Sequence, residues 1–134
     1  MVRKFDINID YKEVKGILDK SFNSAVSFKA KDKGFGNRQM YVLEAHGRIV
    51  ATATLIIVDK FIDDSGCMAI IEDVATAMNS RSKGYASHIV KKLVYESKVL
   101  DCYKIILNCS DGLVPFYERN GFKKDGSLML IDLE

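Results

Sequence analysis

Two long β-type runs separated by only two residues lie in the first half of the chain. The runs are QMYVLEA, residues 39–45, and RIVATATLIIVD, residues 48–59, and His46-Gly47 joins them. A two-residue connection that contains glycine is typical of a tight hairpin, because glycine adopts the positive φ that such turns need. The sequence therefore predicts an antiparallel pair of strands.

The other segments alternate between strand-type and helix-type patterns. Strands are expected at 3–9, 67–78, 103–109 and 127–133, and helices at 10–22, 86–100 and 110–119. Asp10 is the expected N-cap of the first helix, and residues 23–38 are expected to form a loop. The order β-α-β-β-β-α-β-α-β indicates an α/β (α+β) fold, with a mixed central β-sheet flanked by helices. The 134 residues suffice for a single domain, expected over residues 1–134.

Charge and cysteine usage argue against several protein classes. The formal charge of +2 lacks the basic excess of nucleic-acid-binding domains. The three cysteines form no CxxC pair, and His46 and His88 lie far from one another, so we expect neither a disulfide framework nor a metal site. No run reaches membrane-spanning length, and MVRKFDINID lacks a signal-peptide core. These features predict a cytoplasmic protein with no nucleic-acid or membrane partner.

A basic, glycine-containing stretch, NSRSKGYAS, joins a strand-type run to the helix expected at 86–100. A helix start offers unpaired N–H groups and the positive end of the helix dipole. Gly84 and Ala86 remove bulk, and Arg81 and Lys83 add positive charge, so the stretch suits a pyrophosphate. It matches neither the Walker pattern nor GxGxxG. Taken alone, it favours an ordinary connection whose charges face solvent.

Longer segments give this stretch a family context. RSKGYA resembles the [R/Q]-x-x-G-x-[G/A] signature of the GCN5-related N-acetyltransferases, in which the loop holds the pyrophosphate of acetyl-coenzyme A. IEDVAT, CYKIILNCSD and VPFYERNGFKKDG resemble segments of the glucosamine-6-phosphate N-acetyltransferases within that superfamily. The resemblance runs from about Lys60 to Gly126 and implies the fold of that superfamily, with acetyl-coenzyme A as co-substrate. The residues that it assigns to the cofactor are Val74, Ala75, Arg81, Ser82, Lys83, Gly84, Tyr85, Ala86, Ser87, Asn108, Tyr117 and Arg119.

The catalytic candidates are Glu72, Asn108 and Tyr117. Glu72 and Asp73 interrupt an apolar strand, where burial of a carboxylate costs free energy. Their presence is explained either by a functional cleft or by a structural salt bridge to a lysine. The resemblance places this pair at the amino-sugar site, where Glu72 would orient the amine, and has the Tyr117 hydroxyl donate to the departing thiolate. Asn108 stands where similar enzymes carry an acid, and an amide cannot take a proton. The proton of the attacking amine would then pass to Glu72, to Asp111, to a water molecule or to bulk solvent.

The resemblance also assigns a substrate region. Its members are Lys60, Phe61, Ile62, Asp63, Glu72, Asp73, Tyr103 and Lys104. Tyr103 and Lys104 are expected to reach a sugar phosphate across a homodimer interface, and the apolar terminal run SLMLIDLE offers an edge for pairing. Two further departures are Leu113, where asparagine is more usual, and Asp132, which replaces an arginine near the phosphate. The cations that would compensate are Lys29, Lys31, Lys33, Arg38 and Arg119.

The leading hypothesis is an acetyl-coenzyme A-dependent N-acetyltransferase that converts glucosamine 6-phosphate to N-acetylglucosamine 6-phosphate by direct attack, a step towards UDP-N-acetylglucosamine. Two alternatives remain open. One is a related enzyme that acetylates another small amine or a protein N-terminus. The other is a coenzyme A-binding module with weakened catalysis, which the Asn108 and Leu113 departures motivate.

Overall fold

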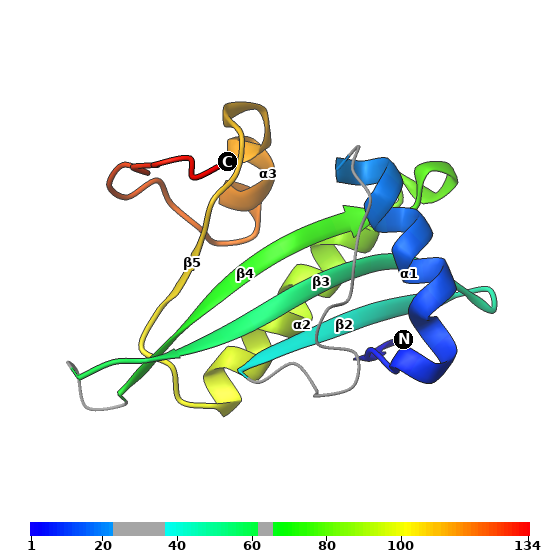
Figure 1. The fold of residues 1–134 in the computed structure, drawn as a ribbon, viewed down its shortest axis with the longest axis horizontal. Coiled ribbons are helices and arrows are strands. Elements are labelled where there is room, and N and C mark those ends of the chain that lie inside the picture. The colour runs from blue at the N-terminus through cyan, green and yellow to red at the C-terminus, as the bar shows by residue number, and fades with distance from the viewer. Residues whose placement is uncertain (23–36, 62–65) are drawn as a thin grey trace.

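The computed structural model describes residues 1–22, 37–61 and 66–134 (Figure 1). Five strands form one sheet in the order β1-β2-β3-β4-β5, in which neighbouring strands are antiparallel except for the parallel pair β4 and β5. The predicted mixed sheet is confirmed. The elements are β1 (Val2–Lys4), α1 (Ile7–Phe22), β2 (Arg38–Ala45), β3 (Arg48–Asp59), β4 (Cys67–Thr76), a 3-10 turn (Met78–Ser80), α2 (Tyr85–Val99), β5 (Ile105–Leu107), a second 3-10 turn (Asp111–Leu113) and α3 (Val114–Arg119).

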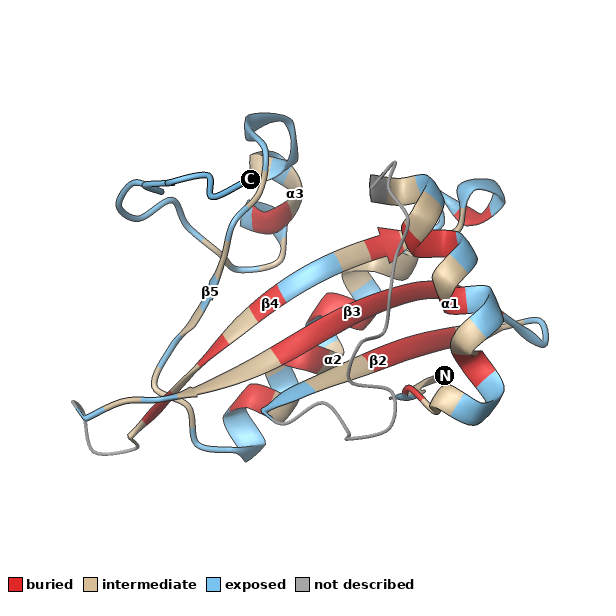
Figure 2. Cartoon of the chain, viewed as in Figure 1, coloured by how far each residue is buried: buried red, intermediate tan, exposed pale blue. Residues whose placement is uncertain are grey.

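Two apolar clusters pack on opposite faces of the sheet. Ile89 and Leu93 of α2 pack with Tyr41 and Leu43 on one face, and Val14 of α1 belongs to the cluster on the other. Successive side chains of a strand point to opposite faces, so β3 is buried almost continuously when both faces are covered (Figure 2). The two helices therefore form the outer layers around the sheet (Figure 1).

The predicted hairpin is confirmed, since β2 and β3 pair across His46 and Gly47, which both have positive φ, 54° and 74°. The helix expected at 86–100 forms as α2, one residue earlier. Leu100, the last residue of the expected helix, lies at the C-cap and is 51% exposed. Ser97 is buried on that helix, with its hydroxyl donating to the Leu93 carbonyl at 2.8 Å.

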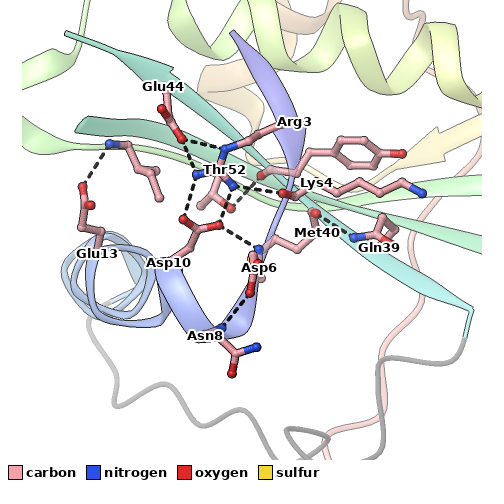
Figure 3. A network of polar contacts seen from close by, with 12 residues as sticks. Arg3, Lys4, Asp6, Asn8, Asp10, Glu13, Gln39, Met40, Glu44 and Thr52 are labelled. Carbon is pink, nitrogen blue, oxygen red and sulfur yellow. Dashed lines mark hydrogen bonds and ion pairs between the residues drawn. The ribbon is translucent and has the colours of Figure 1, made fainter. Parts of the chain in front are cut away.

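The N-terminal prediction was wrong in two respects. The strand stops at Lys4 and the helix begins at Ile7, so residues 3–9 do not form one strand. Asp10 is not an N-cap. Its carboxylate is buried, accepts the Asp6 N–H at 2.8 Å and pairs with Arg3, while the Asp6 side chain accepts the Asn8 N–H at 2.9 Å (Figure 3). The pattern could not reveal this role because it depends on Arg3 in a neighbouring strand.

The C-terminal prediction was also wrong. Residues 123–134 contain no strand, and β5 covers only 105–107 of the expected 103–109. Leu130 and Ile131 are 80% and 84% exposed. An apolar alternating run becomes a strand only when a neighbour supplies hydrogen bonds, and the described part of this chain places none beside it. No helix in the described segments has the length and apolar character needed to cross a bilayer.

Candidate active site

The sheet opens between β4 and β5. Their parallel ladder ends at Ile71 and Leu107, after which the two strands separate (Figure 1). Glu72 follows on β4 and Asn108 follows β5. Past this point no described strand pairs with β4 on that side, so its backbone groups are available to an extended ligand.

A bulge in β4 lies at this opening. Thr52 pairs with Ala75 and Thr54 with Glu72, which leaves Asp73 and Val74 opposite Ala53. Asp73 has a φ of 54°, in the left-handed region. The bulge breaks the alternation of faces, which explains why the consecutive residues Glu72 and Asp73 are both exposed.

Neither carboxylate forms an ion pair with any described residue. The structural salt bridge considered above therefore has no partner in this part of the chain. Although Asp73 retains exposed surface, partial burial of its carboxyl raises the pKa of that group, and the positive charge of Arg38 opposes the rise. Arg38, one of the five cations expected to compensate for Asp132, lies at the start of β2, and its charge acts on Asp73. Of the cofactor candidates on β4, Val74 is half-buried and Ala75 is buried.

The loop before α2 has the backbone that an anion site needs. Gly84 is the N-cap with a φ of 79°, and a Cβ added there would meet no atom within 4 Å. Ser82 also has a positive φ of 65°. The helix leaves the N–H groups of Tyr85, Ala86 and Ser87 without acceptors in its own backbone. Arg81 and Lys83 are exposed and form no ion pair with the described residues.

Tyr117 lies on α3, the short helix beyond the opening. The residue is 8% exposed, and its ring packs edge-on against Phe116 and Phe122, with centroids 4.8 and 5.8 Å apart. Burial, followed by the nearby Cys109, raises the pKa of the phenol, so it stays protonated at neutral pH. Its hydroxyl has no hydrogen-bond partner among the described residues and is not enclosed, which leaves it available as a donor.

The remaining candidates near α3 are exposed. Asn108 lies just past β5, Asp111 and Leu113 in the second 3-10 turn, and Arg119 in the last turn of α3. The helix ends as predicted, with Asn120 as C-cap and Gly121 at a φ of 93°.

The predicted substrate region is not brought together within one chain. Lys60 and Phe61 follow β3, and Tyr103 and Lys104 precede β5, so both pairs lie near the start of β4. There Tyr103 N donates to the Cys67 carbonyl, and Ala69 N donates to the Lys104 carbonyl, each at 3.0 Å. Glu72 is five residues along the strand from Cys67, or about 17 Å at ~3.3 Å per residue. Ile62 and Asp63 lie outside the described residues, as do Lys29, Lys31 and Lys33.

A cavity of about 600 Å³ lies between α1 and the β4–α2 connection and was not predicted from the sequence. Its lining includes Lys12, Ile17, Lys20, Arg48 and Arg81, but neither Glu72 nor Tyr117. Because these residues come from distant segments, no local motif indicates the cavity. Within the described residues, no group of three or more His, Cys, Asp or Glu side chains could hold a metal ion.

The family model described as "Acetyltransferase (GNAT) family" matches residues 11–122, most of the chain. This chain belongs to the GNAT acetyltransferase family. The expected superfamily and its fold are thereby confirmed.

Individual GNAT relatives carry more specific names. A glucosamine 6-phosphate N-acetyltransferase of Candida albicans is 36% identical over 89 residues, 66% of this chain and 60% of that protein. Glucosamine 6-phosphate N-acetyltransferase 1 of rice is 35% identical over 78 residues, 58% of this chain and 47% of that protein. The chain thus spans about half to three fifths of these relatives. The crystal structure of the Arabidopsis thaliana enzyme superposes with a TM-score of 0.85 at 26% identity, over 100% of this chain and 98% of that one.

Proposed function

We propose that this GNAT chain transfers the acetyl group of acetyl-coenzyme A to the amine of glucosamine 6-phosphate. The observation that carries the proposal is the separation of β4 from β5 immediately before the exposed Glu72-Asp73 bulge. The names of the relatives that this chain resembles support the acceptor. We further propose that residues 1–134 form one N-acetyltransferase domain that acts in the cytoplasm.

The cofactor site is proposed at the opening and the loop before α2. Acetyl-coenzyme A supplies the activated thioester and needs an anion site for its pyrophosphate. The free N–H groups of Tyr85, Ala86 and Ser87 and the charges of Arg81 and Lys83 suit that anion. The open space beside Gly84 supports the fit, because a bound group meets no side chain there. Further proposed contacts are Val74, Ala75, Ser82, Asn108, Tyr117 and Arg119.

The chain's own groups have distinct proposed roles. An amine of pKa near ~8 is partly deprotonated at neutral pH, so positioning supplies much of the catalysis. Glu72 orients the amine, and Asn108 accepts a hydrogen bond without taking a proton. The protonated Tyr117 hydroxyl donates to the departing thiolate.

A homodimer is proposed because one chain leaves the substrate region divided. Lys104 lies near the start of β4, away from Glu72, so a second chain would have to supply the phosphate contacts of Tyr103 and Lys104. The exposed apolar segment 128–133 offers a surface for that pairing. Light scattering should give twice the chain mass, and Ile131→Glu should yield a monomer with reduced activity. A wild-type monomer at micromolar concentration would contradict the dimer.

A thiol-release assay tests the activity directly. Acetyl-coenzyme A is mixed with the protein and, separately, with glucosamine 6-phosphate, glucosamine, spermidine or a peptide amine. Release with glucosamine 6-phosphate alone is the expected result. Lys104→Met should raise KM for the sugar phosphate, whereas Lys91→Met, an exposed lysine on α2, should not.

Other outcomes lead to the second candidate functions. Asp132 is exposed and acidic, and an acid at a phosphate site would repel the substrate, which favours an unphosphorylated amine. Release with another amine would establish that acceptor. Tight coenzyme A binding without release would identify a non-catalytic module.

A further inference from the structure

A hydrogen bond between two helices connects the proposed pyrophosphate site to the helix that carries Tyr117. The Ser87 hydroxyl, in the first turn of α2, donates to Asn120 Oδ1 at 2.7 Å. Asn120 Nδ2 donates in turn to the Phe116 carbonyl at 2.9 Å, inside α3. The amide of Asn120 therefore binds α2 through its oxygen and α3 through its nitrogen.

Helix α3 depends on such tethers for its position. It has only six residues, too few to be stable alone, and the preceding chain has already left the sheet at Leu107. Figure 1 shows it set apart from the sheet. Phe122 also connects α3 to the sheet, since it packs edge-on against Tyr117 and also against the core.

The two ends of this bridge lie at two parts of the proposed reaction. Ser87 lies in the first turn of α2, at the end of the loop proposed to hold the pyrophosphate of coenzyme A. Asn120 is three residues from Tyr117, the proposed donor to the thiolate. Proton donation requires the donor and acceptor atoms within about 3 Å, so a small shift of α3 relative to α2 separates them.

We propose that Ser87 and Asn120 are positioning residues that hold the Tyr117 hydroxyl at the thiolate, with the Ser87 hydroxyl acting on α3 and only the Ser87 backbone N–H serving the cofactor. This inference rests on the proposed acetyl transfer and deepens it. It predicts that the Ser87 hydroxyl affects kcat only in an enzyme that retains the Tyr117 hydroxyl.

A double-mutant cycle tests that dependence. Ser87→Ala removes the bridge but leaves the bond from Asn120 to Phe116, so α3 keeps its cap. It should lower kcat about threefold to tenfold, the effect of losing one neutral hydrogen bond, while the Kd for coenzyme A changes less than about twofold. In a Tyr117→Phe background the same substitution should change kcat less than about twofold. Ser87→Thr, which keeps a hydroxyl, should restore most of the loss.

Ser97→Ala is the matched control, because Ser97 is a serine of the same helix whose hydroxyl donates within α2, to the Leu93 carbonyl. It should leave kcat unchanged in both backgrounds. Asn120→Ala should lower kcat at least as much as Ser87→Ala, because it also removes the bond to the Phe116 carbonyl. The double variant should lose little more than Asn120→Ala alone. Equal losses from Ser87→Ala with and without the Tyr117 hydroxyl would overturn the proposal, as would a large rise in the coenzyme A Kd, which would indicate direct cofactor contact.

A second readout needs no turnover. With 3-fluorotyrosine incorporated, and the Tyr117 signal assigned by its loss in Tyr117→Phe, coenzyme A should shift that ¹⁹F resonance in the wild type and shift it less in Ser87→Ala. An unchanged shift in Ser87→Ala would refute the coupling even if the acceptor amine proved to be different. Failure of the wild type to bind coenzyme A would instead overturn the proposed function and this inference with it.

Discussion

The guanidinium of Arg3 holds the buried carboxylate of Asp10 through two hydrogen bonds, Nη1 to Oδ2 at 2.7 Å and Nη2 to Oδ1 at 2.8 Å. Arg3 also bonds Glu44 of β2, so one side chain joins β1, β2 and α1 (Figure 3). Asp10 is only 1% exposed. Without its charge, Arg3 would lose the ion pair to α1 and keep only the one to Glu44 among the described residues. The pair therefore fixes α1 on the sheet.

Asp10→Ala should lower the free energy of unfolding by about 2–3 kcal/mol, the usual range for hydrogen bonds to a charged group, because the Arg3 left behind is 30% exposed and keeps Glu44 as a partner. Urea denaturation at neutral pH measures this loss. Glu96→Gln is the control, since Glu96 pairs with Lys92 on a helix surface, where such pairs contribute about 0.5 kcal/mol. Equal losses in the two variants would show that burial does not strengthen the Arg3–Asp10 pair.

The same pair predicts a loss of stability in acid. The hydrogen bond from Arg3 lowers the pKa of Asp10, while burial opposes that effect. Because the pKa of Asp10 is lower in the folded protein, the unfolded chain binds the proton at a higher pH than the folded protein does. The contribution of the Arg3–Asp10 pair to stability is therefore complete above about pH 4 and is lost as the pH falls through the pKa of Asp10 in the folded protein. The stability difference between wild type and Asp10→Asn should narrow from neutral pH to about pH 3. A constant difference across that range would contradict the assignment.

Local patterns predicted the parts of the fold that local interactions determine. The His46-Gly47 hairpin and α2 were found because a turn type and an apolar face can be recognised within a short segment. The role of Asp10 and the conformation of residues 127–133 were predicted wrongly, because each depends on which distant segment lies beside it. The glycine loop before α2 was visible as a motif. The bond from Ser87 to Asn120 joins residues 33 positions apart, so no short motif contains it.

A close pair of thiols predicts unequal cysteine reactivity. Cys67 Sγ lies 3.2 Å from Cys102 Sγ, and burial, together with that hydrogen bond, raises the pKa of Cys102 to about 11. Since the thiolate is the reactive form, Cys102 should alkylate roughly 100-fold more slowly at pH 8 than a peptide thiol of ordinary pKa. Mass spectrometry after timed iodoacetamide labelling measures the rate. In Cys67→Ala the rate at Cys102 should rise, because the hydrogen bond and the charge effect of Cys67 are removed. An unchanged rate would leave burial and the nearby Asp101 as the causes of the raised pKa.

Tyr117→Phe should separate catalysis from stability. Its hydroxyl makes no hydrogen bond with the described residues, so the phenylalanine should preserve the ring packing against Phe116 and Phe122 and change the unfolding free energy by less than about 0.5 kcal/mol. Removal of a general acid usually costs ~10²–10⁴ in rate, and a thiolate leaves readily, so kcat should fall by about 100-fold, the lower end of that range. The exposed Tyr95 on α2 is the control, and Tyr95→Phe should leave kcat unchanged. A Tyr117→Phe enzyme that keeps full activity would remove the phenol from the mechanism, and water would then be the proton donor to the thiolate.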